Sequence, residues 1–401
     1  MIFQKKRSMP ESRKKIAILI PSLEGGGAER VALFMAESLA KAGYDTDLVY
    51  ARDKGVLREH PVARKLGVCL HARNEMLCLA ELVRYLKSRR PDLVIALVHS
   101  AKIMAGLACV FVPDTRLAIS VHNNLIMPRA DRFWVRRLFG FAPERWLYRH
   151  VVAAHSVSHE LAGQVERCFA IPADKSFTIY NPRNDSPYQD DVALEHRALF
   201  DRPVVLNAGR LVAQKDHAAL IRSFALSGLA GRARLVILGE GPLRARLQAQ
   251  VLALGLEESV ALPGHVPDTR PYLARSSGYA LSSRFEGLAV ALLEALHMGL
   301  PVVSYGCSCG PRELLDHGKL GTLVPPGDEM AFARAMREMV DGGGVRPVAR
   351  AITQHLAMFE PSNIATQYHD FVEHCLAQSN ARWEGLPTLF QGLRRMDECA
   401  E

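Results

Sequence analysis

The chain has 401 residues, of which 49% are hydrophobic and 23% charged, so it can bury the cores of two ordinary domains and is not a wholly disordered protein. The formal net charge of +8 is uneven: residues 1–200 contain 30 Lys and Arg against 21 Asp and Glu, whereas residues 201–401 contain 20 against 21. The basic first half indicates an acidic partner, such as a membrane surface, phosphate groups or nucleic acid.

The first half of the chain alternates apolar runs with amphipathic segments. After a loose tail over residues 1–13, residues 16–21 are continuously apolar, as a strand buried on both faces should be. A glycine turn and a helix from about Ala28 to Ala42 follow, with the apolar side chains on one stripe. Further strands are predicted at 47–51, 93–98, 117–121 and 151–154, and helices at 79–88 and from Ser156 or Ser158 onward. Repeated strand–helix–strand units predict a parallel sheet with helices on both faces.

A polar, proline-containing segment after Asn181 interrupts this alternation, which then resumes. We therefore predict an α/β protein with two doubly wound domains, over 14–182 and 203–360, joined by a linker over 183–202. Residues 361–377 are predicted to form an amphipathic helix that crosses back to the first domain, and 378–401 is left unassigned. The strands expected in the second domain are 204–208, 235–238, 260–262, 278–281, 302–304 and 322–324.

The eight cysteines have neither a CxxC motif nor paired spacing, which is typical of reduced thiols in the cytosol rather than of disulfides or a zinc site. No apolar run approaches the roughly 20 residues that span a bilayer. The run Ile16–Leu23 is too short for a signal peptide, and Glu24 and three glycines follow it in place of a small-residue cleavage site. We therefore expect a cytoplasmic protein.

Ligands of doubly wound domains bind beyond the carboxyl ends of the strands, so residues directly after strands are the candidates for function. Gly25–Gly27 follow the first strand, and glycine lets the backbone approach a phosphate or a sugar at a helix N-terminus. The alternative is a tight turn without a ligand. Arg30 stands where a dinucleotide-binding motif requires glycine or alanine, which argues against NAD.

Two cations and two carboxylates occupy corresponding places in the second domain. Arg210 and Lys215 follow its first strand and could converge on a diphosphate; the alternative is a solvated surface pair. Glu286 follows a later strand, and Glu294 lies eight residues on in an apolar helix, a rise of about 12 Å. That distance corresponds to the span from a hexose to a ribose across a diphosphate. A carboxylate on an apolar helix needs a partner, which favours function over a surface charge.

His122 follows the strand at 117–121, where a histidine has either a structural or a functional role. Asp45 and Asp47 form a D-x-D sequence, which in another fold holds a divalent metal. There the motif follows an apolar strand, whereas here it opens one. We therefore predict no metal site.

Several of these segments resemble motifs of one enzyme family, the retaining glycosyltransferases of family 4. The strongest match is Ser283-Arg284-Phe285 followed by Glu286 and, eight positions on, Glu294. The sequence departs from the family pattern at Ala289, where proline or glycine is usual. The resemblance covers about residues 14–375 and implies the GT-B fold, with two facing Rossmann-like domains and the active site in the cleft between them. The further matching segments are 25–29, 209–215, 239–242, 263–268, 310–313 and 321–325.

The resemblance also implies the reaction and its partners. The enzyme would be a hexosyltransferase that moves a sugar from a nucleotide-diphosphate sugar, with a UDP-sugar favoured, to a hydroxyl of a glycan acceptor. The acceptor would be lipid-linked, and the pathway would build a cell-surface polysaccharide or glycan. The family implies retention by same-face attack, with the leaving phosphate helping to deprotonate the acceptor. No metal or other cofactor is expected.

Roles for the second domain follow from the same resemblance, residue by residue. Arg210 and Lys215 would hold the donor diphosphate, and Glu294 would bind the ribose hydroxyls. Glu286 would contact the donor sugar near the reacting carbon, as a catalytic residue. Val266 would lie at the nucleotide base.

Roles for the remaining site residues involve both domains. His122 would touch the transferred sugar from the first domain, as the second catalytic residue. Gly26 and Gly27 would approach the diphosphate or the sugar. The backbone amides of Gly287 and Leu288 would lie near the reacting carbon, and the acceptor would bind mainly to the first domain.

The segment Arg129–Arg149 contains six arginines interleaved with aromatic residues, which is typical of a helix at an anionic bilayer surface. We therefore predict peripheral association with the inner face of the cytoplasmic membrane. The alternative is that the apolar residues face the domain core and the arginines face water. The expected membrane contacts are Arg132, Trp134, Arg136 and Arg137.

Three other functions compete with glycosyl transfer. A nucleotide-sugar epimerase of the same fold is hardest to separate by motifs alone. An NAD-dependent oxidoreductase disagrees with Arg30 and leaves Glu286, Glu294, Arg210 and Lys215 unexplained. A nucleic-acid-binding protein would suit the basic charge, but no binding motif for it is present, and no nucleic-acid partner is expected.

Overall fold

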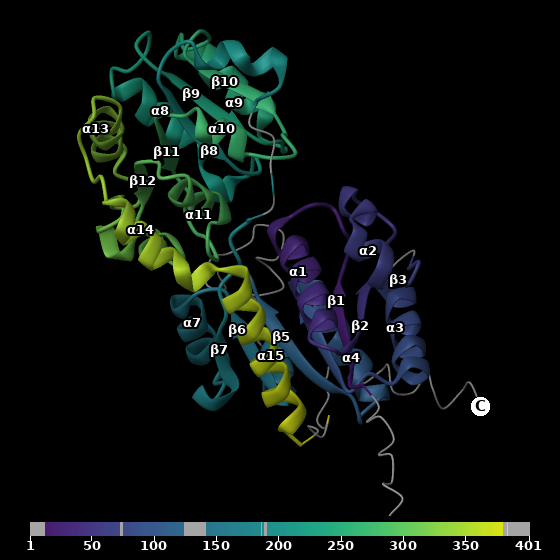
Figure 1. Cartoon of the computed structure of the whole chain (residues 1–401). Helices are drawn as coiled ribbons and strands as arrows, with labels where there is room; N and C mark the ends of the chain where they lie inside the picture. Colours follow the sequence, from purple (N-terminus) through teal and green to yellow (C-terminus); the bar gives the residue numbers. More distant parts are fainter. Residues whose placement is uncertain are drawn as a thin grey trace, which may run out of the picture.

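The computed structural model describes residues 13–72, 75–123, 142–185, 187, 191–379 and 383. In this part of the chain, two α/β domains each contain one parallel sheet with helices packed on both faces (Figure 1). The N-terminal domain is drawn in purple and blue and the C-terminal domain in teal and green. The predicted pair of doubly wound domains is therefore confirmed.

The N-terminal sheet has the strand order β3-β2-β1-β4-β5-β6-β7 among the described residues. Its central strands are almost completely buried, which explains their continuously apolar sequences. The strand predicted at 151–154 forms two residues later, because its register with β5 begins at Ala153, while the apolar residues before it are buried at the strand entry. The strands are β1 (Lys15–Ile20), β2 (Asp45–Tyr50), β3 (Gly67–Cys69), β4 (Leu93–Leu97), β5 (Arg116–Val121), β6 (Ala153–Ser156) and β7 (Ser176–Thr178).

The C-terminal sheet repeats this topology, with the order β10-β9-β8-β11-β12-β13. In both sheets the order reverses beside the first strand, between β1 and β4 and between β8 and β11. Loops diverge at such a switch point and leave room for a ligand. The strands are β8 (Val204–Ala208), β9 (Arg234–Leu238), β10 (Val260–Gly264), β11 (Gly278–Leu281), β12 (Val302–Tyr305) and β13 (Thr322–Val324).

The helices cover both faces of each sheet (Figure 1). In the N-terminal domain they are α1 (Gly27–Lys41), α2 (Pro61–Leu66), α3 (Glu75–Arg89), α4 (His99–Phe111), α6 (Ala142–His150) and α7 (His159–Phe169). In the C-terminal domain they are α8 (His217–Leu226), α9 (Arg244–Ala253), α10 (Arg270–Ala274), α11 (Val290–His297), α12 (Pro311–Leu314), α13 (Glu329–Val340) and α14 (Ala349–Leu356).

The last helix, α15 (Pro361–Ala377), leaves the C-terminal domain and runs along the N-terminal one, where Figure 1 draws it in yellow. Its apolar stripe, which includes Tyr368 and Phe371, is buried in the core formed with α1 and the strands β4 and β5. The predicted linker contains one short 3-10 helix, over Leu194–Phe200. The chain therefore crosses between the domains twice, through the linker and through the segment before α15.

Candidate active site

The carboxyl ends of the two sheets face each other, and this brings together loops that are far apart in the sequence. The glycine loop follows β1 and His122 follows β5, while Arg210 follows β8 and Glu286 follows β11. A Cβ atom added at Gly287 would lie 2.0 Å from the carbonyl oxygen of His122, so the two domains touch here backbone to backbone. The switch points of both sheets therefore open toward a common region.

A buried ion pair joins two of the predicted residues. The Lys215 ammonium lies 2.6 Å from Oε1 of Glu286, and the hydroxyl of Ser283 donates to the same oxygen at 2.6 Å. The Glu286 side chain is only 6% exposed, so its charge needs these donors. No described residue donates to its other oxygen, Oε2. That oxygen and the remaining protons of the Lys215 ammonium can bind a ligand.

Hydrogen bonds connect the loops after β8 and β11 along their length. The Gln214 side chain donates to the carbonyl of Phe285 at 3.0 Å, and the hydroxyl of Ser282 donates to the carbonyl of Lys215 at 2.9 Å. Arg284 forms an ion pair with Asp216 at 2.6 Å. The positions of the lysine and of Glu286 are thus set by the backbone as well as by their own contact.

Arg210 is exposed, and its guanidinium forms no hydrogen bond or ion pair with any other described residue. It lies close enough to Glu29 of α1 for its charge to lower the pKa of that carboxyl. Burial outweighs this effect and raises the pKa of Glu29 above its usual range. A guanidinium without a side-chain partner, in the same loop as Lys215, is suited to a diphosphate, because it can donate two parallel hydrogen bonds.

Glu294 lies in α11 and accepts a hydrogen bond of 2.6 Å from the Thr269 hydroxyl. Burial raises the pKa of Glu294, whereas this hydrogen bond and the charge of Arg30 act in the opposite direction. Arg30 comes from α1 of the other domain and also lowers the pKa of Asp268. The carboxylate of Glu294 therefore has a partner, as predicted, in the Thr269 hydroxyl of its own domain, and its pKa also responds to the charge of Arg30 from the other domain.

The donor loop, defined as residues 286–289, is tightly placed. Leu288 is buried, and its carbonyl lies 2.7 Å from where a Cβ atom on Gly310 would be. Ala289 precedes α11 with φ +69°, in the left-handed region that glycine adopts without penalty. This conformation explains why glycine suits the position, while the fixed φ of proline would not fit here.

His122 lies at the end of β5 with Nε2 2.6 Å from the hydroxyl of Ser120. Burial and the nearby charge of Lys102 lower the pKa of His122 to about 3, so its ring is neutral at physiological pH. The ring packs edge-on against His155, with centroids 6.3 Å apart. A neutral imidazole fits a hydrogen bond to a sugar hydroxyl better than a contact with phosphate.

The two predicted glycines of the first loop differ. A Cβ atom on Gly26 would lie 2.4 Å from Oε2 of Glu29, whose carboxylate is folded over this residue. A Cβ atom on Gly27 would meet no heavy atom within 4 Å, so that residue faces open space. Gly27 is thus the more accessible of the two. Val266, predicted at the base, is buried directly after β10.

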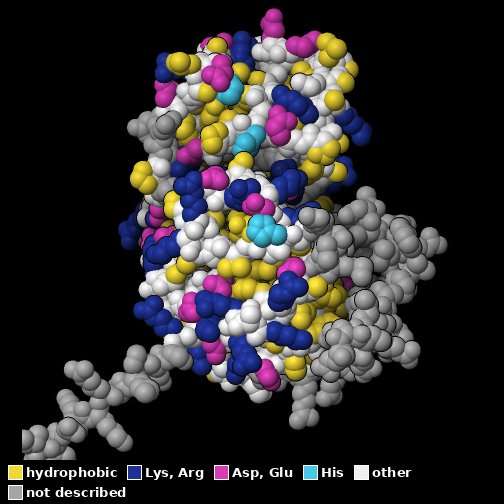
Figure 2. Space-filling view, turned by 90° about the vertical axis from the view of Figure 1, so that its right-hand side faces the viewer, with side chains coloured by type: hydrophobic (Ala, Val, Ile, Leu, Met, Phe, Trp, Pro, Cys, Tyr) yellow, Lys and Arg dark blue, Asp and Glu magenta, His cyan; other side chains and the backbone are white. Residues whose placement is uncertain are grey.

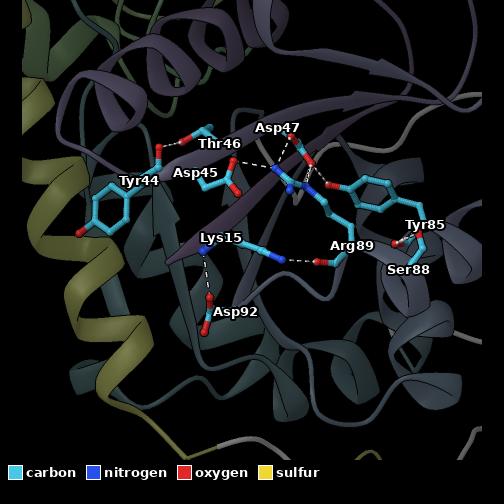
Figure 3. A network of polar contacts seen from close by, with 9 residues as sticks. All are labelled: Lys15, Tyr44, Asp45, Thr46, Asp47, Tyr85, Ser88, Arg89 and Asp92. Atoms are coloured by element: carbon cyan, nitrogen blue, oxygen red, sulfur yellow. Dashed lines mark hydrogen bonds and ion pairs between the residues drawn. The ribbon is translucent and has the colours of Figure 1, made fainter. Parts of the chain in front are cut away.

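The D-x-D residues lie at the opposite end of the N-terminal sheet. Figure 3 shows Arg89 of α3 between them: it is 2.6 Å from Asp45 and 2.7 Å from Asp47, and Tyr85 donates to Asp47 at 2.7 Å. These residues open β2 and therefore lie at its amino end, away from the candidate site. Within the described residues, no group of three or more His, Cys, Asp or Glu side chains is arranged to hold a metal ion.

The predicted membrane contacts Arg132, Trp134, Arg136 and Arg137 lie outside the described residues. The described end of that segment is α6, where Leu147 is buried in the core and Arg149 is exposed. In this portion the apolar face is used for the domain core. No helix in the described ranges is long and apolar enough to cross a membrane.

Sequence reasoning missed four residues that contact the site or face it. Ser283 and Thr269 hold the two glutamates, and Glu29 and Arg30 face the C-terminal domain from α1. The sequence carried a signal for each, because Ser283 and Glu29 stand within the matched motifs and Thr269 and Arg30 each directly follow one. The sequence did not predict which side chains of the two domains lie close to one another.

Comparison with known proteins identifies the family of the chain and agrees with the fold. Residues 25–186 match the family model described as Glycosyltransferase Family 4, and residues 195–354 match the model Glycosyl transferases group 1. The chain is 30% identical over 346 residues to N-acetylgalactosamine-N,N'-diacetylbacillosaminyl-diphospho-undecaprenol 4-alpha-N-acetylgalactosaminyltransferase of Campylobacter jejuni, covering 83% of this chain and 92% of that one. It is 26% identical over 366 residues to the amylovoran biosynthesis glycosyltransferase AmsD of Erwinia amylovora, covering 89% and 99%.

Among solved structures, Alr3699/HepE of Anabaena, in complex with UDP and glucose, is similar with a TM-score of 0.75 at 20% identity, over 90% of this chain and all of that one. The lipopolysaccharide outer core galactosyltransferase WaaB is similar with a TM-score of 0.67 at 19% identity, over 90% and 99%. These likenesses concern the fold, which is that of GT-B enzymes. The chain is a glycosyltransferase and belongs to glycosyltransferase family 4.

Proposed function

We propose that this enzyme is a retaining hexosyltransferase that transfers a sugar from a nucleotide-diphosphate sugar to a hydroxyl of a lipid-linked glycan. The product would be a cell-surface polysaccharide or glycan. The single observation that carries the donor assignment is the ion pair of Lys215 and Glu286 at the switch point of the C-terminal sheet, with Arg210 in the same loop as Lys215. A diphosphate needs fixed cations, and these two come from one loop.

The transition state supports these roles. As the glycosidic bond to the diphosphate breaks, negative charge grows on the phosphate oxygens and positive charge on the sugar ring. Arg210 and the Lys215 ammonium would stabilise the phosphate, and the carboxylate of Glu286 lies beside them to face the ring. Because protein cations supply the positive charge, we expect turnover without a divalent metal. Activity in EDTA tests this, and complete loss restored by Mg²⁺ or Mn²⁺ would contradict it.

The donor would lie along α11 and reach both domains. Glu294, held by Thr269, would accept hydrogen bonds from the ribose hydroxyls, and Arg30 would approach them from α1. A UDP-sugar is favoured because the similar Anabaena structure contains UDP and glucose. Retention would proceed by same-face attack, in which the leaving phosphate accepts the proton of the acceptor hydroxyl.

A lipid-linked acceptor is supported by the relatives and by the charge of the chain. The Campylobacter relative is named for a diphospho-undecaprenol acceptor, and a relative of Rhizobium meliloti for lipopolysaccharide core biosynthesis. The basic residues 1–200 would favour an anionic membrane surface. On the face in Figure 2, Lys and Arg side chains are interspersed with Asp and Glu. The proposed membrane contact is the arginine-rich segment Arg129–Arg149.

The first experiment identifies the donor with a panel of UDP-, GDP- and ADP-sugars, read by thermal shift. A ligand at 100 times its Kd should stabilise the fold by about 2.7 kcal/mol. Transfer is then measured to a short diphosphate-lipid acceptor, and the anomeric configuration of the product is read by NMR. Retained configuration supports the proposal. An epimerised nucleotide sugar formed without an acceptor would overturn it.

Membrane contact is tested by co-sedimentation with vesicles of rising anionic lipid content at low and high salt. We expect binding that increases with anionic lipid and falls with salt. Charge reversal at Arg132, Arg136 and Arg137 should abolish it while sparing donor hydrolysis in solution. Equal, negligible binding to neutral and anionic vesicles at low salt would refute the idea.

A further inference from the structure

A carboxylate of the C-terminal domain caps a helix of the N-terminal domain. Glu313, in α12, accepts hydrogen bonds from the backbone amides of His159 at 3.0 Å and Glu160 at 2.8 Å, which are the first two residues of α7. Tyr180 donates its hydroxyl to the same carboxylate at 3.0 Å. Burial raises the pKa of Tyr180, so its hydroxyl stays protonated and remains a donor. A negative charge at a helix N-terminus is favourable, and the one here comes from another domain.

The contact is reciprocal. The first turn of α7 carries Glu160, whose side chain accepts a hydrogen bond of 2.9 Å from the backbone amide of Cys309. Gln164, one turn further along α7, donates to the Cys309 sulfur at 3.2 Å. Each domain therefore supplies a carboxylate that binds backbone amides of the other. We call Glu160 and Glu313, with the amides that they bind, the interdomain latch.

The segment that carries the latch also touches the donor loop. Ser308 pairs with Phe285 in a parallel β-bridge, directly before Glu286. Gly310 has φ +88°, and a Cβ atom there would lie 2.7 Å from the carbonyl of Leu288. Residues 307–313 thus lie between α7 on one side and the donor loop on the other. Any movement of α7 relative to this segment would pass to the loop by direct contact.

Close approach between the domains is most demanding at the donor loop itself. A Cβ atom on Gly287 would overlap the carbonyl group of His122, so the two backbones are in contact. The latch and this contact are therefore made only when the domains are close together. If the domains separate, Glu313 loses three donors and Glu160 loses one.

We propose that the interdomain latch holds the two domains closed on the donor and that Glu313 is a positioning residue for sugar transfer. It acts through the segment 307–313, which keeps Gly287 of the donor loop against His122. This inference rests on the proposed function. It adds a residue that touches neither the donor nor the acceptor but sets the distance between the two halves of the site.

The test uses the full chain with Glu313→Ala, Glu313→Gln and Glu160→Ala. Glu329→Ala is the matched control, because that glutamate forms an ion pair with Arg222 within the C-terminal domain. Without substrate, we expect faster hydrogen exchange at the amides of His159 and Glu160 in both Glu313 variants. Small-angle X-ray scattering should show a larger radius of gyration, most for Glu313→Ala and less for Glu313→Gln, which keeps one acceptor oxygen. The control should match the wild type in both measurements.

The kinetic arm uses the nucleotide sugar that the wild-type protein selects from the panel. We expect kcat/KM for this donor to fall roughly ten- to hundredfold in Glu313→Ala, with intermediate loss in Glu313→Gln, because part of the binding energy must now close the domains. A double variant with Glu160→Ala should lose less than the product of the single losses, since both changes open the same contact. If Glu313 had only a structural role, its variants would lower the unfolding temperature, but kcat/KM would not fall in the order Glu313→Gln, then Glu313→Ala.

The outcomes separate the two ideas. Unchanged exchange, scattering and kcat/KM in all Glu313 and Glu160 variants would overturn the latch, even if the wild type transfers sugar. Opened domains in these variants, together with a wild type that binds no nucleotide sugar, would retain the latch and reject the proposed function. If Glu313→Ala does not fold, Glu313→Gln and Glu160→Ala carry the same measurements.

Discussion

Two cation–carboxylate clusters lie at opposite ends of the parallel sheets and use similar residues in different ways. At the amino end of the N-terminal sheet, Arg89 binds Asp45 and Asp47, and Tyr85 completes the group (Figure 3). At the carboxyl end of the C-terminal sheet, Lys215 binds Glu286. In the first cluster, the carboxylate oxygen of Asp45 that Arg89 leaves unbound belongs to a side chain 36% exposed to water, whereas in the second the unbound oxygen belongs to Glu286, only 6% exposed.

The difference is visible atom by atom. Both carboxylate oxygens of Asp47 accept hydrogen bonds, and the guanidinium of Arg89 bridges two strand-opening residues. In the second cluster, Oε2 of Glu286 has no donor among the described residues, and the nearby Arg210 is uncommitted. A polar cluster that is complete holds the fold together, and one that is incomplete is ready for a ligand. Substitutions in the two clusters test this rule, because they should affect activity in one cluster and stability in the other.

The largest effect is expected for Lys215→Ala. Removing the ammonium takes away a fixed cation from the departing diphosphate, so kcat/KM should fall roughly 10²–10³-fold, as for other preorganised donors. Steady-state kinetics measures the fall, and circular dichroism shows whether the fold is kept. Lys319→Ala is the control, since that exposed lysine forms a surface ion pair with Asp316. Wild-type activity in Lys215→Ala would remove the cluster from the active site.

The two glutamates should differ in kinetic signature. Glu286→Gln should lower kcat most, because its carboxylate would matter as charge develops on the sugar. Glu294→Gln should raise the donor KM roughly tenfold with little change in kcat, because a ribose contact is the same in the ground and transition states. Equal changes of kcat and KM in both variants would contradict separate roles.

The sequence predicted the two sheets and most strands, because buried parallel strands are continuous apolar runs. It also predicted that Arg210, Lys215 and Glu286 follow strands, and they lie in the loops after β8 and β11. It did not predict that Lys215 binds Glu286 directly or that Glu313 caps α7. Such contacts depend on side-chain rotamers and on the distance between domains, and neither has a periodic pattern in the sequence.

Arg89→Ala should affect stability and spare activity. The change leaves Asp45 and Asp47 without their shared cation, and these side chains are 36% and 15% exposed, so water compensates in part. We expect the free energy of unfolding to fall by about 1–2 kcal/mol in urea titrations. Arg84→Ala, on the same helix but 72% exposed, should change it by less than about 0.5 kcal/mol. A loss of kcat/KM in Arg89→Ala would contradict the purely structural role of the cluster at the amino end of the N-terminal sheet.

His155 is a third kind of polar group, because it is fully buried on β6 and neither ring nitrogen has a partner among the described residues. Burial lowers its pKa well below the ordinary 6.5. As pH falls below 6.5, the unfolded state gains a proton that the folded state does not, so stability decreases, by at most about 1.4 kcal/mol per pH unit. His155→Phe should flatten this acid slope in urea titrations at pH 7, 6 and 5.

The matched control for this pH dependence is His265→Phe. His265 is exposed, and the substitution leaves His155 in place, so the slope should remain as in the wild type. An unchanged slope in His155→Phe would mean that the folded protein accommodates the charged ring. In that case a buried side chain without hydrogen-bond partners would not lower stability at acid pH, even with no ligand bound.

The smallest expected effect is at Ala289, and it tests whether the carboxyl edge also stores backbone strain. Ala289 has φ +69°, a conformation that costs an L-residue roughly 1–2 kcal/mol relative to the right-handed region. In Ala289→Gly, relief of this cost opposes the loss of a buried methyl group and the greater freedom of the unfolded chain, each of about 1 kcal/mol. The free energy of unfolding should therefore change by less than about 1 kcal/mol.

The control is Ala295→Gly, within α11 and also buried, where no backbone strain is relieved. Its free energy of unfolding should fall by at least about 1 kcal/mol more in the same titration, because both costs apply without compensation. Equal losses in both variants would mean that the donor loop holds its shape without strain, and that only its unsatisfied charges distinguish the carboxyl edge from the amino edge.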